Sequence, residues 1–346
     1  MTLSAPAIDI LTAGRSRRSR RLRATVLTMF TIMVAFFALT LMLGQSFTPP
    51  GDVLQVVLGR EVPGAGFTVG QLRLPRAVLS VLSGLSFGLG GVAFQIMLRN
   101  PLASPDIIGV SAGASAAAVF GIVFLSLDGA SVSMLAIVAG LAVALLIYGL
   151  SFKDGVTGSR LILVGIGISA MLHSVIAYAL TRAPSWDLQE AMRWLSGSVN
   201  GARLDQAGLL LLSQLVFGGI LLSRHRDLES LRMGDEVATA LGVQVGVTRL
   251  LVILSATGMI AVATAITGPI AFVAFLSGPI AAWIVGPNGS ILIPSALVGA
   301  TLVLIGDYIG QFALPSRYPV GVVTGALGAP YLIYLIIRAN RSGSSL

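Results

Sequence analysis

The side chains that most often perform catalysis or bind metals are scarce in this chain. Its 346 residues include no cysteine, two histidines (His173 and His225) and a single lysine, Lys153. Without cysteine there are no thiolate metal sites or iron–sulfur clusters, and two histidines are too few for a multi-histidine metal centre. The one lysine is not preceded by the glycine-rich pattern of a P-loop. We therefore expect no enzyme, no metal and no cofactor on this chain, and any ATP hydrolysis must occur on another chain.

Two isolated polar residues lie within apolar runs. Asp307 is the one acid well inside such a run. A carboxylate at the centre of a bilayer costs about 2.5–3.5 kcal/mol on insertion scales, so Asp307 should face protein or water. It could bind a coupling proton, although a single acid favours a structural hydrogen bond. His173 lies in another run, where a histidine is more often a satisfied core residue than a ligand.

Arginines form a second candidate group. The segment from Gly70 to Arg76 reads GQLRLPR and stands at the outer start of the second expected helix. Arg73 and Arg76 could extend to lipid phosphates, or they could contact an acidic partner outside the membrane. Arg317, in the last expected external loop, could join them.

Small residues at helical spacing form a third group. Such spacing is typical of close helix crossings, and the same residues would leave room for a translocation path. We expect two stretches to form the wall of that path, one in the second expected helix and one at residues 109–115. The residues are Gly84, Gly88, Gly91, Gln95, Gly109, Ser111, Gly113 and Ser115.

The most polar internal loop, residues 227–242, predicts a short helix. Asp235 and Glu236 fall in its first turn after Gly234, Gly242 ends it, and Ala238 and Leu241 share one face. A helix this short is marginal alone and needs a surface to pack on. It could lie on the membrane or dock into a cytoplasmic partner.

The elements that must position these residues are membrane helices. The chain is 55% hydrophobic and 10% charged, with 41 glycines, whereas a soluble domain carries about 25% charged residues. Apolar runs of about 20 residues can span a bilayer as helices. Breaks at charges, glycines and prolines predict ten spans: 24–51, 77–98, 107–127, 129–152, 161–181, 207–223, 247–266, 270–285, 290–311 and 318–337.

Charge placement predicts the orientation. With the N-terminus inside, 15 of the 22 lysines and arginines fall on the cytoplasmic side, as the positive-inside rule requires, and both termini are cytoplasmic. The net charge of +8 reflects this topology and not nucleic-acid binding. We expect residues 1–20 to be a disordered basic segment and residues 21–346 to form one transmembrane domain. The first apolar run is too long for a signal peptide and lacks a cleavage site.

These motifs in this order resemble the FecCD-type permeases of ABC importers, which take up iron chelates and vitamin B12. The resemblance rests on RLPR at 73–76, RNPLASPDIIGVSAGAS at 99–115, MGDEVATALGV at 233–243, GPIAF at 268–272 and YPVGVVTGALGAPYLIYLIIR at 318–338. It implies an all-α, BtuC-like permease of about ten helices in the bacterial cytoplasmic membrane. The chain differs from the family pattern after GPIAF. The family usually continues to Pro-His or Pro-Gln with an arginine shortly after, whereas this chain has Gly278-Pro279-Ile280.

The resemblance also implies partners. A second permease subunit would form a dimer around a central pathway, and the departure at Gly278 favours a non-identical partner. Cytoplasmic ATPase subunits, which bind ATP and Mg²⁺, would dock on the coupling helix at about 233–243. An extracytoplasmic binding protein would meet Arg73, Arg76 and Arg317.

The function expected from these features is import of an iron(III)–siderophore. Because the chain offers so few iron ligands, the iron should pass inside its organic chelator. Cobalamin or haem is an alternative cargo within the same family. A proton-coupled secondary transporter using Asp307 and a structural membrane protein are alternatives from other classes, and the siderophore and the resting conformation stay open.

Overall fold

The computed structural model describes residues 5–105, 109–152, 158–286 and 289–341, so Lys153 and residues 106–108 of the 99–115 motif lie outside it. Every regular element in these ranges is a helix. The longer helices are α1 (Ala5–Met42), α3 (Leu74–Leu98), α4 (Val110–Leu125), α5 (Gly129–Ser151), α6 (Gly158–Arg182), α12 (Val245–Thr267), α13 (Val273–Val285), α14 (Leu292–Tyr308) and α15 (Val320–Arg341).

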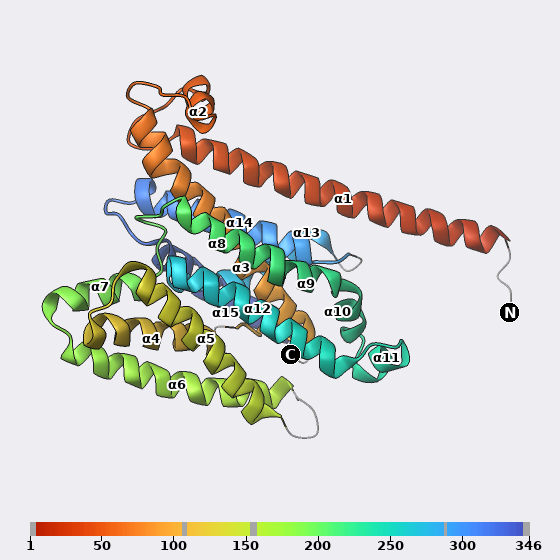
Figure 1. The fold of residues 1–346 in the computed structure, drawn as a ribbon. Helices are drawn as coiled ribbons and strands as arrows, with labels where there is room; N and C mark the ends of the chain where they lie inside the picture. The colour runs from red at the N-terminus through yellow and green to blue at the C-terminus, as the bar shows by residue number, and fades with distance from the viewer. Residues whose placement is uncertain (1–4, 106–108, 153–157, 287–288, 342–346) are drawn as a thin grey trace.

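The shorter helices lie between the long ones. They are α2 (Pro50–Val57), α7 (Ser185–Leu195), α8 (Asp205–Ser213), α9 (Gly219–Ser223), α10 (His225–Leu231) and α11 (Asp235–Ala240). Helices α8 and α9 together form one membrane-spanning stretch, Asp205–Ser223. Three π-helical segments continue the long helices: Gly66–Arg73 leads into α3, Gln214–Gly218 joins α8 to α9, and Ile309–Ala313 extends α14. Figure 1 shows α2 and α7 at one end of the bundle and α10 and α11 at the other.

Helix α3 forms the centre of the bundle. It packs against α12, α13 and α14, while α4, α5 and α6 pack on one another to one side (Figure 1). Glycines permit this close approach: a Cβ at Gly84 or Gly88 would collide with the backbone of α14, and one at Gly91 would collide with the carbonyl of Ala274 in α13. Small residues at helix crossings are the usual means of packing helices within a membrane.

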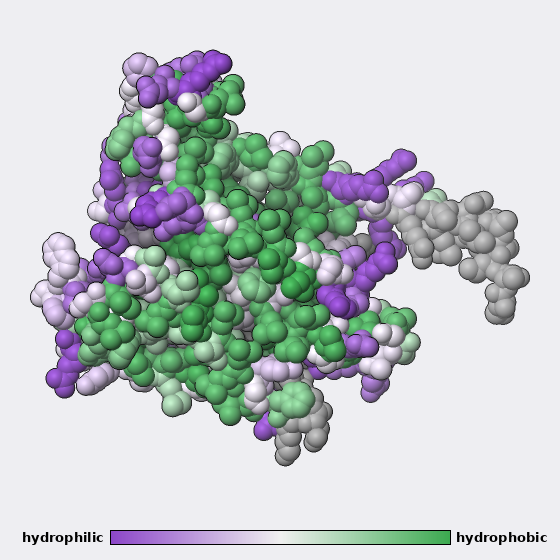
Figure 2. Space-filling model, in the orientation of Figure 1, coloured by the Kyte–Doolittle hydropathy of each residue, from purple (hydrophilic) through white to green (hydrophobic). Residues whose placement is uncertain are grey.

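The expected spans are all present. Seven helical stretches are long and apolar enough to cross a bilayer, and three shorter apolar helices, Val110–Leu125, Val273–Val285 and Val320–Leu335, occupy the other expected places. Figure 2 shows the hydrophobic surface as a broad band across the middle of the molecule, with polar residues gathered at its two ends. The chain is a multi-pass, all-α membrane protein.

The structure differs from the sequence-based boundaries in two places. Helix α1 runs without a break from Ala5 to Met42, so residues 5–20 are helical and not the disordered segment expected. This stretch contains four arginines and three alanines, which are good helix formers. The span expected at 24–51 ends at Met42, and the helix of the second span begins at Gly66 in place of residue 77.

Candidate functional site

Arg73 is buried, which corrects its expected place on an external docking surface. Its side chain lies in the last turn of the π-helical segment before α3, and the residue is 8% exposed. The guanidinium donates hydrogen bonds to the carbonyls of Leu41 (2.9 Å), Met42 (3.1 Å) and Ser46 (2.7 Å). Carbonyls at the end of a helix lack intrahelical donors, so Arg73 satisfies the end of α1.

Arg76 and Asp307 form a bidentate ion pair between α3 and α14. Arg76 Nε and Nη2 donate to the two carboxylate oxygens, each at 2.6 Å, and both side chains are largely buried. Nη1 also reaches the side-chain oxygen of Asn200 at 3.4 Å. Two parallel charge-assisted hydrogen bonds fix both groups in one geometry. Asp307 therefore has the structural partner that its apolar surroundings demand, which favours the hydrogen-bonding role over proton binding.

Of the three expected docking arginines, Arg317 is the exposed one. It follows the π-helical extension of α14, at the end of the bundle that carries α7, and the residue is exposed. Arg60, Arg193 and Arg203 are exposed at the same end. The sequence placed RLPR just before a helix, which suggested an external loop. In the structure this segment is itself helical and continues into α3.

Helix α11 is present where it was expected, but its outward face differs. Gly234 precedes it with φ of 111° and Gly242 follows with φ of 86°, conformations that favour glycine. Ala238 is completely buried against the bundle, whereas Leu241 is 61% exposed. The two residues expected to share a face are therefore separated.

The exposed apolar residues around α11 are Met233, Val237 and Leu241, each four positions from the next. We call these three residues the α11 stripe. Asp235 pairs with Arg249 of α12 at 2.8 Å, and Glu236 is exposed. The spacing of four between these residues is visible in the sequence. The sequence does not show that the side of the helix with Ala238 packs on the bundle and that the α11 stripe faces outward. An apolar stripe beside charged residues suits a protein partner.

The expected pathway residues of α3 lie in helix packing instead. Gly84 and Gly88 face the backbone of α14, and Gly91 faces α13, so these three glycines contact neighbouring helices closely. Gln95 is buried and donates a hydrogen bond from Nε2 to the carbonyl of Phe275 at 3.0 Å. We therefore do not retain these four residues as the pathway wall.

The contact of Gln95 explains the unusual Gly278-Pro279 pair. Pro279 lies inside α13 and has no N–H to give the carbonyl four residues earlier, that of Phe275. Gln95 supplies the missing donor. A Cβ at Gly278 would collide with the side-chain oxygen of Gln95, so a larger residue there would displace the Gln95 amide from this contact.

Ser111 and Ser115 line a cavity of about 800 Å³, which we call the inner cavity. Its walls come from α4, α6 and α15, from the α3–α4 and α12–α13 connections, from the end of α7 and from the start of α13. The lining residues are Leu102, Ser104, Ser111, Ala112, Ser115, His173, Ile176, Leu195, Pro269, Ile270, Ala271, Phe272, Phe275 and Leu332. Gly109 and Gly113, expected beside the serines, instead pack against Ser169 of α6 and Val143 of α5.

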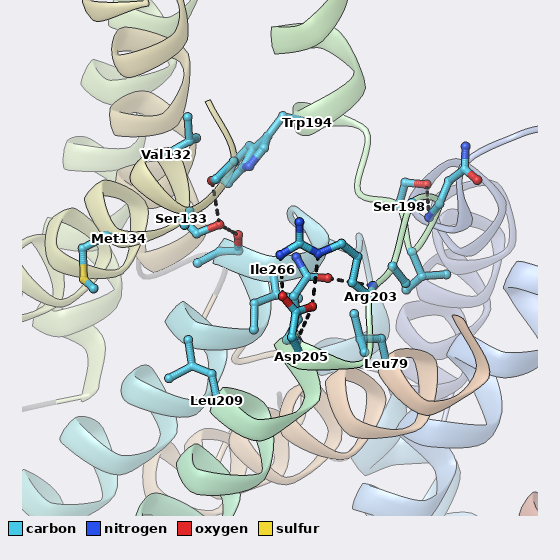
Figure 3. Close-up of a pocket in the computed structure, with 18 of the residues that line it drawn as sticks. Leu79, Val132, Ser133, Met134, Trp194, Ser198, Arg203, Asp205, Leu209 and Ile266 are labelled. Carbon is cyan, nitrogen blue, oxygen red and sulfur yellow. Dashed lines mark hydrogen bonds and ion pairs between the residues drawn. The ribbon is translucent and has the colours of Figure 1, made fainter. Parts of the chain in front are cut away.

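A second cavity of about 530 Å³, the outer cavity, lies between α5, α7 and α8. Figure 3 shows Arg203 paired directly with Asp205 on one side of it, with Trp194 and Ser133 on another side. The hydrogen bond to the Asp205 carboxylate raises the pKa of Arg203. Charged residues here, including Glu190, contrast with the uncharged lining of the inner cavity in the described residues.

A backbone junction separates the two cavities, since Trp194 lines the outer one and Leu195 the inner one. A Cβ at Gly197 would meet the carbonyl of Pro269, one at Gly268 would meet that of Trp194, and one at Gly321 would meet that of Ser196. We call these three glycines the glycine junction. Nothing in the local sequence linked them, because they come from segments far apart in the chain.

Comparison with known proteins agrees with this architecture. The family model of the FecCD transport family matches residues 32–338. The iron(3+)-hydroxamate permease FhuG of Bacillus subtilis (strain 168) is 34% identical over 94% of this chain and 100% of its own length. The ferric enterobactin permease FepG of Escherichia coli (strain K12) is 36% identical over 93% of this chain and 98% of its own.

A solved structure shares the fold. It is an inward-facing metal-chelate type ABC transporter with a TM-score of 0.79 and 26% sequence identity, covering 91% of this chain and 99% of that one. The family match, the full-length relatives and the ten apolar helices concur. The chain belongs to the FecCD transport family of ABC importer permeases.

Proposed function

We propose that this chain is the permease subunit of an ATP-driven importer for an iron(III)–siderophore in the bacterial cytoplasmic membrane. The observation that supports this most is the full-length similarity to permeases named for ferric hydroxamate and ferric enterobactin uptake. The inner cavity, bounded by several separate segments of the bundle, is large enough for a compact organic chelate. The permease performs no covalent chemistry.

Cytoplasmic ATPase subunits dock on the α11 stripe and bind the ATP and Mg²⁺. Support comes from its three exposed apolar side chains and from the rigid mounting of α11, which Ala238 and the Asp235–Arg249 ion pair hold against the bundle. A helix fixed in this way can transmit movement of a partner to the membrane helices. Both termini lie on this cytoplasmic side.

An extracytoplasmic binding protein docks at the opposite end, with Arg317 as an exposed cation that attracts acidic residues on that protein. Arg76 contributes only the part of its guanidinium left open beside Asn200, since two nitrogens bind Asp307. Arg73 contributes by holding the end of α1 and not by direct contact.

A second permease subunit, non-identical to this one, packs against α6 and α15. Both helices line the inner cavity through His173 and Leu332, and both present exposed apolar residues such as Met171 and Tyr334. A partner on this face would complete the wall of the cavity. Gly278 gives no support for the non-identical partner, because it contacts Gln95 within the chain.

Reconstitution tests the function. The permease pair, its ATPase and its binding protein are placed in proteoliposomes, and uptake of a ⁵⁵Fe-labelled siderophore is followed with active ATPase, with a hydrolysis-deficient ATPase and with a proton gradient alone. Uptake with the active ATPase only is the expected result. Uptake driven by the gradient alone would support a proton-coupled secondary transporter. Uptake of cobalamin or haem, and not of the siderophore, would mean that the importer carries that compound.

A further inference from the structure

The wall of the inner cavity is mainly apolar and carries a few polar groups. Its described lining is apolar apart from three serines and His173, and it includes no aspartate, glutamate, lysine or arginine. Its volume of about 800 Å³ lies within the range of about 300–1,000 Å³ typical of small-molecule sites. Such sites combine apolar walls with a few placed polar groups that orient the ligand.

Two helices begin at this cavity. Ser111 and Ala112 belong to the first turn of α4, and Phe275 belongs to the first turn of α13. With 16 and 13 residues, these helices are about 24 Å and 20 Å long, which is less than the roughly 30 Å of the hydrocarbon core. They are the third and the eighth span, so they run in opposite directions and both begin inside the membrane.

The amino ends of short helices inside a membrane favour anions. The first N–H groups of a helix lack intrahelical acceptors, and the helix dipole adds a partial positive charge there. Transporters with broken membrane helices direct such ends at the anionic groups of their cargo. At the inner cavity, the ends of α4 and α13 are not offset by any carboxylate among the described lining residues.

Ser115 provides an independent sign of a ligand. The residue is 4% exposed and lines the cavity, yet no described residue pairs with its hydroxyl. An unpaired hydroxyl that lines a mainly apolar cavity is available to donate a hydrogen bond to a ligand or to water. His173 lies on α6, is exposed, and lines the same cavity. A hydroxyl and an imidazole can each donate a hydrogen bond to an oxygen.

We infer that the inner cavity binds the organic shell of an anionic ferric chelate, with the Ser115 hydroxyl and the His173 imidazole donating to its outer oxygens. This inference rests on the proposed function. The preferred cargo class is the catecholate or carboxylate chelates, which carry negative charge, over neutral hydroxamates. The cavity contacts the chelator and not the iron, so Ser115 and His173 are specificity-determining residues for the transported complex.

The first test compares uptake by variants of the reconstituted complex. Ser115→Ala and His173→Leu should each lower uptake of an anionic ferric catecholate about tenfold, because each removes one hydrogen bond to a charged acceptor. Uptake of a neutral ferric hydroxamate should change less than twofold. His173→Gln should restore part of the catecholate uptake, because an amide also donates. Leu146→Ala, at an exposed position on α5 outside the cavity and the proposed subunit interface, is the matched control.

Three further measurements separate a direct contact from damage to the protein. ATPase activity stimulated by the binding protein should match the parent complex in every variant. A gallium(III) chelate of the same siderophore should show the same dependence on Ser115 and His173, since the metal is not touched. The chain has no cysteine, so His173→Cys introduces its only thiol. A small thiol reagent should label it more slowly when chelate is present, while Leu146→Cys on α5 is labelled at an unchanged rate.

The outcomes distinguish this inference from the proposed function. If the parent complex imports catecholate with ATP but Ser115→Ala and His173→Leu do so equally well, and chelate leaves the labelling of residue 173 unchanged, the inference is overturned and the proposed function stands. A larger effect on neutral hydroxamate than on catecholate would also overturn it. If the parent complex imports no chelate with ATP, the proposed function itself fails.

Discussion

At the scale of single residues, several polar side chains support backbone that the membrane would otherwise leave unpaired. Arg73 satisfies carbonyls at the end of α1, and Gln95 satisfies the carbonyl that Pro279 leaves free. Within a lipid bilayer, no solvent can replace these donors. Both residues were expected to serve function, and both serve the fold.

Removing the amide of Gln95 should therefore destabilise the protein. Gln95→Leu leaves the Phe275 carbonyl buried without a donor, at a cost of about 1–3 kcal/mol. The melting temperature of the purified permease should fall, whereas Leu209→Ala, at an exposed position on α8, should leave it nearly unchanged. An unaltered melting temperature for Gln95→Leu would mean that the hydrogen bond contributes nothing.

Charge reversal distinguishes the external arginines. Arg317→Glu should reduce stimulation of the ATPase by the binding protein about tenfold at low salt, because exposed charges act mainly on the rate of association. Arg73→Ala should instead lower the yield of folded protein, since Arg73 is buried. If the binding protein stimulates the ATPase equally in the parent and Arg317→Glu complexes at every salt concentration, Arg317 does not take part in docking.

At the scale of elements, sequence patterns located the helices better than their faces. The glycines at 234 and 242 bounded the short helix, and α11 lies between them. Which row of that helix faces outward depends on α10 and α12, which pack beside it. The pairing of α3 glycines with α14 likewise depends on a contact between distant segments, which periodicity in one helix cannot reveal.

The α11 stripe gives a prediction for this element. Leu241→Asp should weaken ATPase binding about 30-fold or more, the scale of a central interface residue, and abolish coupled transport. Thr239→Asp places the same charge at an exposed position outside the stripe. This variant should copurify with the same amount of ATPase as the parent permease. Normal copurification of both variants would refute docking through the stripe.

The glycine junction gives a second prediction. Gly268 has φ of 69°, and a side chain there would collide with the carbonyl of Trp194. Gly268→Ala should therefore cost more than about 1 kcal/mol and lower the melting temperature. Gly208→Ala, in helix α8 with open space around it, should be neutral or slightly stabilising. Equal melting temperatures would show that the junction tolerates a side chain.

At the scale of the whole molecule, composition determined most of the architecture. The ten apolar runs correspond to ten helices, because a bilayer requires every span to be long, apolar and internally hydrogen-bonded. The inner cavity could not be predicted in full, since its walls include α4, α6, α15 and the α12–α13 connection. Ser111 and Ser115 were identified by their small size, whereas His173 was assigned to the core.

The central claim is that the α11 end of the molecule faces the cytoplasm and receives force from an ATPase. A Leu241→Cys variant carries the only thiol of this chain and can be treated with a membrane-impermeant thiol reagent. We predict labelling in inverted vesicles stripped of ATPase, protection when the ATPase rebinds, and no labelling of sealed cells. Labelling of residue 241 from outside intact cells would contradict the account.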